Sequence, residues 1–537
     1  MERLWETKAN DDERRAFGAD CDRILYSSAF RRLTGVTQVV SASETELFHN
    51  RLTHSYKVAQ VGARITHTIK SLMESDSEVG DEVQQHGGLD PRVVRAACFA
   101  HDLGHPPFGH VAEKELDQIL CPTDKQNDPE IDPAYHLADG FEGNAQSFRI
   151  VTKLAFREEN AVALDLTRAT LRALLKYPWL RNEDLGNIDD MLAEKRKEKW
   201  GAYDSESAIL NFARGTALNA DEPQRLDQRQ VDFHGREATE LRTIEAQIMD
   251  WADDITYAIH DVEDFFRAGL IPLDQLKKDD RAFDMFLEAV WPSIDKQVGE
   301  QATTTNPGDE NAITIENARN WMYGVRRNRF PGRPYTGRRS DREGLHTFAS
   351  ELIRGATEKL KITKGGLLLP GPQQFTVIEI LKKMTKYYVI QRPGISSAQR
   401  GQSLLIRRLF KGLLNWAVDG KVFGTLQDIV ADASAGKNAV GTGFEPELVD
   451  RILVEFREFP ARFVDYLVVA FDHDGKIGCT EYYNPKTDRW IEYTPEQRLS
   501  RAIVDYIVSL TESQTVALDA RLNGFPAESM LEKWISV

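Results

Sequence analysis

Two histidine–carboxylate pairs lie within the eighteen residues from Cys98 to Glu115, CFAHDLGHPPFGHVAEKE. His101 and Asp102 are adjacent at the end of an apolar run. His110 and Glu113 stand three residues apart, a spacing that places both on one face of a helix. Imidazole and carboxylate groups bind divalent metals and also move protons. Each pair alone is common on a solvated helix, but the two around one turn favour a metal site with an acid–base pair beside it.

The segments around these pairs must supply helices that hold them. Gly104 and Pro106-Pro107 cannot continue a helix, so the first helix has to end near His101. Asp90-Pro91 is a suitable N-cap followed by proline at the first helical position, and it predicts where that helix begins. Residues 49–69, HNRLTHSYKVAQVGARITHTI, have apolar residues at helical spacing. That helix carries His54 in its first turns.

A third helix is predicted over residues 239–266, which contain WADDITYAIHD. Asp253, Tyr257 and Asp261 are spaced four apart and therefore lie along one face. An acidic solvated face is one interpretation of this ladder. Together with His54 and His101, its carboxylates instead form a mixed nitrogen and oxygen set that suits a divalent first-row metal.

The composition limits the classes of function. The chain has 537 residues, which is too long for one simple core, and a net charge of −16 that disfavours broad non-specific nucleic-acid binding. Its four cysteines are scattered without a CxxC pair, which argues against a disulfide framework or a Cys-based zinc site and favours a reducing cytoplasm. The charged N-terminus does not read as a signal peptide, and no apolar run approaches the length of a membrane span.

Runs with strand-like alternation are few, so we expect a mainly α fold with a helical C-terminal extension and one possible small β-hairpin near 476–494. The expected organisation is a loose lead-in at 1–22, a catalytic core at 23–290 with a charged surface excursion at 181–235, an Arg-rich insertion or loop at 291–345, and a helical region at 346–537.

Four motifs occur in one order along the chain: NRLTHS, FAHDLGHPPFGHVAE, GFEGNAQ and WADDITYAIHD. Together they resemble the deoxyguanosinetriphosphate triphosphohydrolase family, the dNTPase branch of the HD-domain phosphohydrolases. The resemblance runs from about Arg23 to Phe266, with weaker echoes at 381–393 and 501–512. It implies an HD-domain helical core that hydrolyses dGTP or several dNTPs to a deoxynucleoside and triphosphate.

The resemblance also implies roles for single residues. The family's metal ligands fall on His54, His101, Asp102 and one aspartate of the WADD run. Asp253 fits this last place because Tyr257 and Asp261 follow it at the family's distances of four and eight residues. The implied ion is Mn²⁺ or Mg²⁺, with Fe, Co or Ni as other choices.

The catalytic pair of the family falls on His110 and Glu113, and His110 either moves a proton or orients the attacking water. Arg51 resembles a phosphate contact, and Gln38 resembles a sugar contact. The full set of substrate-binding residues that the resemblance implies is Gln38, Arg51, Asn144, Lys176, Tyr177, Tyr257 and Asp261.

Two other classes of protein remain open. A different HD enzyme, such as a phosphodiesterase or nucleotidase, would keep the four metal ligands but would have no reason to carry HPPFGHVAE. A non-catalytic nucleotide sensor on an HD scaffold should have lost ligands, and this chain has kept all four.

The segment 326–342, RRNRFPGRPYTGRRSDR, carries seven arginines in an acidic protein. A solvated loop is one interpretation. The other is an anion site for a regulatory dNTP, single-stranded DNA or a neighbouring subunit. The resemblance further implies a homo-oligomer, with a hexamer as one form, and no membrane partner.

Overall fold

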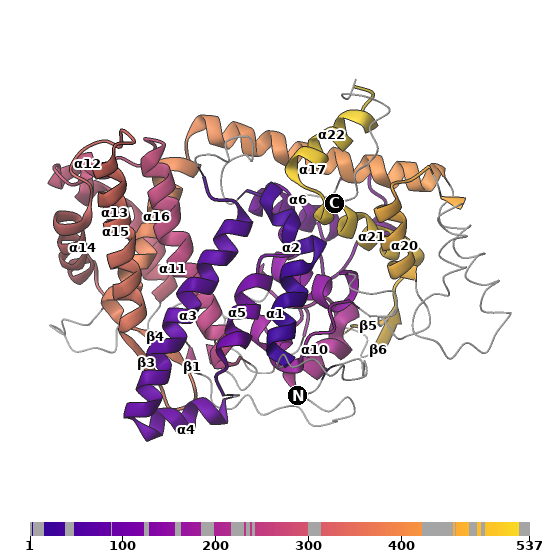
Figure 1. Cartoon of the computed structure of the whole chain (residues 1–537). Coiled ribbons are helices and arrows are strands. Elements are labelled where there is room, and N and C mark those ends of the chain that lie inside the picture. Colours follow the sequence, from indigo (N-terminus) through magenta and orange to yellow (C-terminus); the bar gives the residue numbers. More distant parts are fainter. Residues whose placement is uncertain are drawn as a thin grey trace.

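Helices form most of the regular structure in a computed structural model of the chain (Figure 1), and the expected mainly α fold is confirmed. The structure describes Arg3 and residues 16–37, 48–86, 88–122, 128–155, 163–183, 198–215, 230–231, 237–238, 242–298, 313–420, 455–456, 458–471, 481–484 and 489–525.

The N-terminal half contributes ten described α-helices: α1 (Ala16–Tyr26), α2 (Ser28–Arg32), α3 (Arg51–Ser75), α4 (Ser77–Gln85), α5 (Pro91–Ala100), α6 (His110–Leu120), α7 (Gly143–Arg149), α8 (Arg168–Leu174), α10 (Ser207–Arg214) and α11 (Ile244–Arg267). Short 3-10 or π turns lie between them: η1 (Leu33–Gly35), η3 (Pro133–Tyr135), η4 (Ile150–Leu154) and η5 (Asp204–Glu206).

The C-terminal half continues with α12 (Leu273–Leu276), α13 (Asp280–Val298), α14 (Ile315–Arg329), α15 (Arg339–Glu358), α16 (Pro372–Thr385), η7 (Lys386–Ile390), α17 (Pro393–Asp419), α20 (Ala461–Phe471), α21 (Pro495–Ser509) and α22 (Glu512–Leu522). Three two-stranded antiparallel sheets are described: β1 (Gln230–Val231) with β2 (Glu237–Ala238), β3 (Leu360–Ile362) with β4 (Leu368–Pro370), and β5 (Glu481–Asn484) with β6 (Arg489–Glu492). The last pair is the hairpin expected near 476–494.

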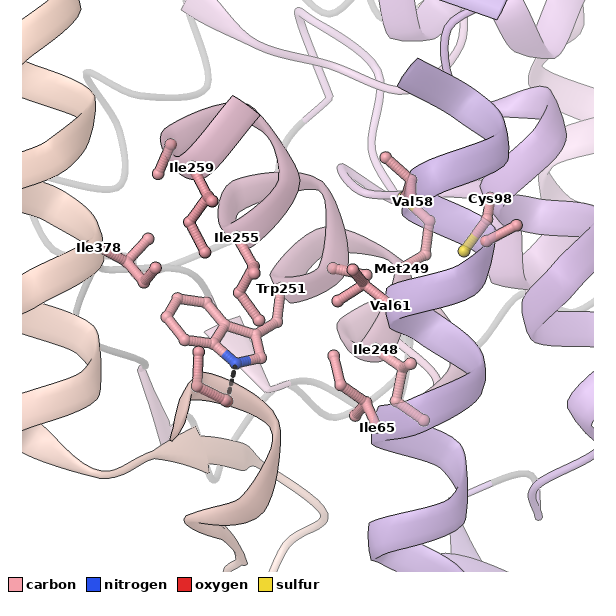
Figure 2. Close-up of a cluster of buried hydrophobic side chains, with 14 of the residues drawn as sticks. Val58, Val61, Ile65, Cys98, Ile248, Met249, Trp251, Ile255, Ile259 and Ile378 are labelled. Carbon is pink, nitrogen blue, oxygen red and sulfur yellow. Dashed lines mark hydrogen bonds between the residues drawn. The ribbon is translucent and has the colours of Figure 1, made fainter. Parts of the chain in front are cut away.

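The helix α11 is the centre of the larger hydrophobic core because it is apolar on two opposite sides. Ile248 points toward Val61 and Ile65 of α3, whereas Trp251 points toward Ile378 of α16 (Figure 2). Trp251 Nε1 also donates a hydrogen bond to the Ala356 carbonyl at 3.1 Å. Burial of each large aliphatic side chain stabilises the fold by about 1.5–3 kcal/mol, so α3, α11 and α16 are held as one layered unit.

A second hydrophobic core joins the C-terminal helices to α6, the helix that begins at His110. The long helix α17 runs across the molecule to α20–α22 (Figure 1) and packs on α6, α21 and α22. Leu116 of α6 and Leu409 of α17 are both fully buried in this core. The C-terminal helices therefore pack directly against α6, the helix that carries His110 and Glu113.

Helix starts follow from side-chain caps that the sequence encodes. Asn50 accepts a hydrogen bond from Thr53 N and opens α3, and Asp90 accepts one from Arg92 N and opens α5 with Pro91 in the first turn. Thr243 caps α11 in the same way. These caps satisfy backbone N–H groups that have no partner inside the helix.

Three expectations about irregular segments are wrong in the part of the chain that is described. Residues 16–22 belong to α1, where Asp20 is buried and accepts hydrogen bonds from Thr167, rather than to a loose lead-in. Within 181–235, Trp200 and Tyr203 enter the second core. Within 291–345, the end of α13, the whole of α14 and the start of α15 are helical rather than a loop. None of the described helices is long and apolar enough to cross a membrane.

Candidate active site

Three helices bring the expected metal ligands together. His54 lies in the first turn of α3, His101 directly follows α5, and Asp253 lies near the middle of α11. The helices α3 and α5 approach closely at Gly62, where a Cβ atom would lie 3.0 Å from Cys98 Sγ. The small residue thus allows the two histidine-bearing helices to pack side by side.

The ligand atoms of this cluster face one another. Asp253 Oδ1 lies 3.0 Å from His54 Nε2 and 3.6 Å from His101 Nε2, and Asp102 Oδ1 lies 3.5 Å from His101 Nε2. His54, His101 and Asp253 offer atoms that all lie within 4.8 Å of one another. The four residues that the sequence singles out as ligands are therefore adjacent in space.

The protonation of His101 fits a metal site. Its Nδ1 donates to the carbonyl oxygen of Cys98 at 2.7 Å, so the lone pair of the neutral ring is on Nε2. That Nε2 is buried and has no hydrogen-bond partner among the described residues. Two imidazole nitrogens and two carboxylates make a donor set of the kind that divalent Mn, Fe, Co or Mg accepts, so the residues present fit such an ion.

Two cations keep the carboxylates of the cluster ionised. Arg51 Nη1 donates to Asp102 Oδ2 at 2.8 Å, and Lys176 Nζ lies 3.2 Å from Asp253 Oδ2 and 2.7 Å from Asp250 Oδ1. Burial alone would raise the pKa of Asp253, but Lys176 and the two facing histidines outweigh it and hold that pKa well below the usual value. Arg51 likewise outweighs burial and lowers the pKa of Asp102.

The adjacent Asp254 belongs to a different environment. Its Oδ1 accepts from Lys382 Nζ at 3.1 Å, on the side of α11 that faces α16. Asp253, rather than Asp254, is therefore the residue of the WADD run that lies against His54.

The His110–Glu113 pair is stabilised by Lys199, a residue that the sequence did not single out. His110 Nδ1 lies 2.7 Å from Glu113 Oε2, and Lys199 Nζ donates to Glu113 Oε1 at 2.7 Å and to Glu142 Oε1 at 2.8 Å. The His110 side chain is 67% exposed, whereas Glu113 is buried. Burial disfavours the charged form of Glu113, but Lys199 and His110 outweigh it and hold its pKa well below the usual value.

His105 and Lys199 are absent from the residues that the sequence singles out. His105 Nδ1 lies 3.2 Å from Asp102 Oδ1, and its ring centre is 5.5 Å from that of His110, so it lies between the two pairs. Burial and the nearby Arg51 lower its pKa well below the usual value. A third histidine within HDLGHPPFGH is a signal that could have found it, but the charged run before Trp200 offers no such signal for Lys199.

The turn between the pairs is fixed by close packing. A Cβ atom on Gly104 would lie 2.2 Å from Ser147 N, so only glycine fits there. Phe108 has φ +67° and Gly109, the N-cap of α6, has φ +56°. Positive φ at Phe108 is uncommon for a residue with a side chain, and it aims the first turn of α6 back toward His105.

Besides Arg51 and Lys176, the predicted substrate-binding residues that the structure describes lie in three places. Asn144 lies beside Glu142, the second carboxylate that Lys199 contacts, because Asn144 Nδ2 donates to Glu142 Oε1 at 2.9 Å. Tyr177 is buried with its ring 5.7 Å from that of Trp179. Tyr257 and Asp261 lie one turn apart on the same face of α11.

Burial raises the pKa of both Tyr257 and Asp261, and for each the neighbouring aspartate adds to the rise. Gln38 lies outside the described residues. The residue before it, Thr37, pairs with Asn50 at the start of α3.

Comparison with known proteins places this site inside a recognised domain. The HD domain family matches residues 51–258, which include all four clustered ligands. A Streptomyces coelicolor protein named deoxyguanosinetriphosphate triphosphohydrolase-like protein is 32% identical over 452 residues, covering 80% of this chain and 88% of that protein. Proteins of the same name from Shewanella sediminis and Corynebacterium efficiens are 31% and 35% identical, over 61% and 49% of their own lengths.

Proposed function

The chain belongs to the deoxyguanosinetriphosphate triphosphohydrolase-like family of HD-domain phosphohydrolases, and we propose that it hydrolyses a deoxynucleoside triphosphate, dGTP or several dNTPs, to deoxynucleoside and triphosphate. The observation that carries the proposal is the position of the His110–Glu113 pair, joined through His105 to the cluster of His54, His101 and Asp253. An acid–base group thus lies beside a set of metal donors.

The proposed reaction depends on a divalent ion, Mn²⁺ or Mg²⁺ in the first instance, held by His54, His101, Asp102 and Asp253. When bound, such an ion polarises a phosphoryl oxygen and lowers the pKa of a coordinated water. The unpartnered, buried Nε2 of His101 supports this assignment.

Phosphoryl transfer requires mainly positioning and neutralisation of negative charge. Lys176 supplies a cation within 3.2 Å of Asp253 and is suited to contact the phosphates. Arg51 is only 1% exposed and already bonds to Asp102, so its first role is to orient that ligand, and only a phosphate that lies against Asp102 could contact it.

His110 is suited to handle the proton of the attacking water. Glu113 is ionised and can only accept, so the Nδ1 of His110 carries the proton and Nε2 carries the lone pair. Nε2 can then orient a water molecule or take up its proton.

The position of the sugar determines which phosphorus reacts. Tyr257 lies one helical turn from Asp253, a rise of about 6 Å at ~1.5 Å per residue. A deoxyribose held by Tyr257 and Asp261 so near the metal ligands leaves room for only its first phosphate over them. Attack of water at the α-phosphorus would then break its bond to the 5′-oxygen, so that the deoxynucleoside leaves and the three phosphates remain joined as triphosphate.

Product analysis tests this proposal. The full chain is incubated with dGTP and Mn²⁺, and the products are separated by ion exchange and followed by phosphorus NMR. We expect triphosphate and deoxyguanosine, with slower turnover but unchanged metal content in His110→Ala. Orthophosphate or pyrophosphate as the first product, with dGDP or dGMP left behind, would assign the chain to another HD chemistry.

A further inference from the structure

One carboxylate oxygen in the last described helix holds two segments that lead into the candidate active site. Glu512, the first residue of α22, is 3% exposed. Its Oε1 accepts hydrogen bonds from Thr37 N at 3.0 Å, from the Thr37 hydroxyl, and from Phe108 N at 3.3 Å. These donors are 475 and 404 residues away in sequence.

The Thr37 segment leads to the metal and sugar side of the site. Thr37 pairs with Asn50, the cap of α3, and the carbonyl of Val36 accepts from Arg51 N at 3.1 Å. These contacts therefore fix the position of the start of α3, with Arg51 and His54, relative to the Thr37 segment. Gln38, the proposed sugar contact, is the next residue.

The Phe108 segment leads to the acid–base pair. Phe108 has the left-handed φ noted above, and His110 follows it by two residues as the first residue of α6. A strained backbone persists only where its surroundings fix it. The hydrogen bond from Phe108 N to Glu512 is one such constraint.

The segment just before Glu512 has a second contact with the turn that follows His101 and Asp102. Arg32 donates through Nη1 to the Leu510 carbonyl at 3.2 Å and through Nη2 to the carbonyls of Leu103 and His105 at 2.8 Å each. Gly35 permits the close approach, since a Cβ there would lie 2.7 Å from Thr511 Cγ2.

We propose that Glu512 is a positioning residue for hydrolysis: it sets the Thr37 and Phe108 segments relative to each other, and so sets the start of α3, with Arg51 and His54, relative to His110. The proposal rests on the proposed function for its kinetic consequence, but not for its structural one. It gives the C-terminal helix α22 a part in catalysis without any contact to substrate.

Three substitutions of Glu512 distinguish the position of its acceptor oxygen from its negative charge. Glu512→Gln keeps an acceptor oxygen at the same reach, and Glu512→Asp keeps the charge but withdraws it by one methylene. Glu512→Ala removes both. Gln514→Ala is the matched control. Gln514 Oε1 accepts a hydrogen bond from Thr511 N at 2.9 Å, so its loss should loosen the start of α22 without removing a contact to the Thr37 or Phe108 segment.

Kinetics with dGTP and Mn²⁺ give the first readout. We expect kcat/KM to fall about tenfold or more in Glu512→Asp and Glu512→Ala, to stay within about threefold in Glu512→Gln, and to change little in Gln514→Ala. Bound metal should be unchanged in all four. A helix-dipole role for the charge predicts the reverse order for Asp and Gln, and that order would overturn the proposal.

Amide hydrogen exchange gives a readout that needs no activity. Peptides that cover Val36–Thr37 and Phe108–His110 should exchange faster together in Glu512→Asp, but not in Gln514→Ala. Unchanged protection of either peptide would overturn the proposal. If the wild-type chain hydrolyses no dNTP, the proposed function fails, while the exchange data still decide the role of Glu512.

Discussion

Lys199 Nζ lies 2.7 Å from Glu113 Oε1, so a lysine from a charged loop sets the ionisation of the carboxylate that holds His110. The same ammonium lies 2.8 Å from Glu142, a carboxylate whose pKa is raised by burial. The ammonium of Lys199 therefore lies between two buried carboxylates and offsets their mutual repulsion, which would otherwise favour protonation of one of them.

Removal of that cation should change the pH dependence of hydrolysis. In Lys199→Met, the largest effect that opposes burial is removed and mainly His110 remains, so the pKa of Glu113 should rise and His110 should lose its ionised partner at low pH. We expect kcat/KM at neutral pH to fall about tenfold or more, and the acid limb of its pH profile to move to higher pH. Lys114→Met, at an exposed residue next to Glu113, should leave the profile unchanged; a parallel shift there would assign the effect to overall charge.

Metal retention should distinguish two adjacent aspartates. Asp253 faces His54 at 3.0 Å, whereas Asp254 bonds to Lys382. Asp253→Ala should abolish metal retention after dialysis, and Asp254→Ala should largely keep it, as measured by elemental analysis with Mn²⁺. The opposite result would mean that the ligand assignment on α11 is wrong by one residue.

Helical spacing predicted the local geometry of the site. Four-residue steps place Asp253, Tyr257 and Asp261 on one face of α11, and the breaks around Gly104 end α5 near His101. The assignment of His54, His101 and Asp253 to one metal site came from the family resemblance, because helical spacing relates only neighbours in sequence. Lys199 and Glu512 reach their partners through tertiary packing. No periodicity marks such contacts.

The helix α14 was missed for a different physical reason. Its sequence has few apolar residues, but Arg326 is 2% exposed, with its guanidinium 4.5 Å from the ring centre of Tyr323 and 5.1 Å from that of Phe283. Arginine stems and cation–π contacts here take the place of aliphatic burial. A pattern search that counts arginine as polar therefore predicts a loop.

The arginine segment 326–342 gives a test of regulation and assembly. Arg329, Arg333 and Arg339 pair with carboxylates of this chain, but Arg338 and Arg342 are exposed. We propose that this surface binds a regulatory dNTP, single-stranded DNA or a neighbouring subunit of a homo-oligomer such as a hexamer.

Replacing Arg338 and Arg339 with Ala should then weaken activation by dNTP mixtures or single-stranded DNA, or shift the assembly state in light scattering, and the effect of DNA should decrease with salt. The exposed Arg400→Ala on α17 is the control. Identical activation and mass in the double variant would make this surface a solvated one.

Stability should depend on pH through Glu245, which is 5% exposed at the start of α11. Burial raises its pKa from 4.5 to about 7. Because the folded pKa lies above the unfolded one, the stabilising contribution is complete below about pH 4.5 and is lost as pH rises through 7. We expect Glu245→Gln to be more stable than wild type at pH 8 by about 2–3 kcal/mol, in urea denaturation. The exposed Glu74→Gln should retain the wild-type slope, and an unchanged slope in Glu245→Gln would show that this carboxyl titrates normally.

Discrimination between deoxyribose and ribose should depend on the ring of Tyr257. Tyr257 and Asp261 lie on one face of α11 beside the proposed sugar position, and burial raises the pKa of both. A 2′-hydroxyl would have to occupy space that the packed ring fills. Tyr257→Ala should therefore lower the ratio of kcat/KM for dGTP to that for GTP by about tenfold or more. Tyr257→Phe keeps the ring and should keep most of the ratio. Equal loss of discrimination in Tyr257→Phe and Tyr257→Ala would mean that the hydroxyl recognises the sugar and that steric exclusion by the ring does not.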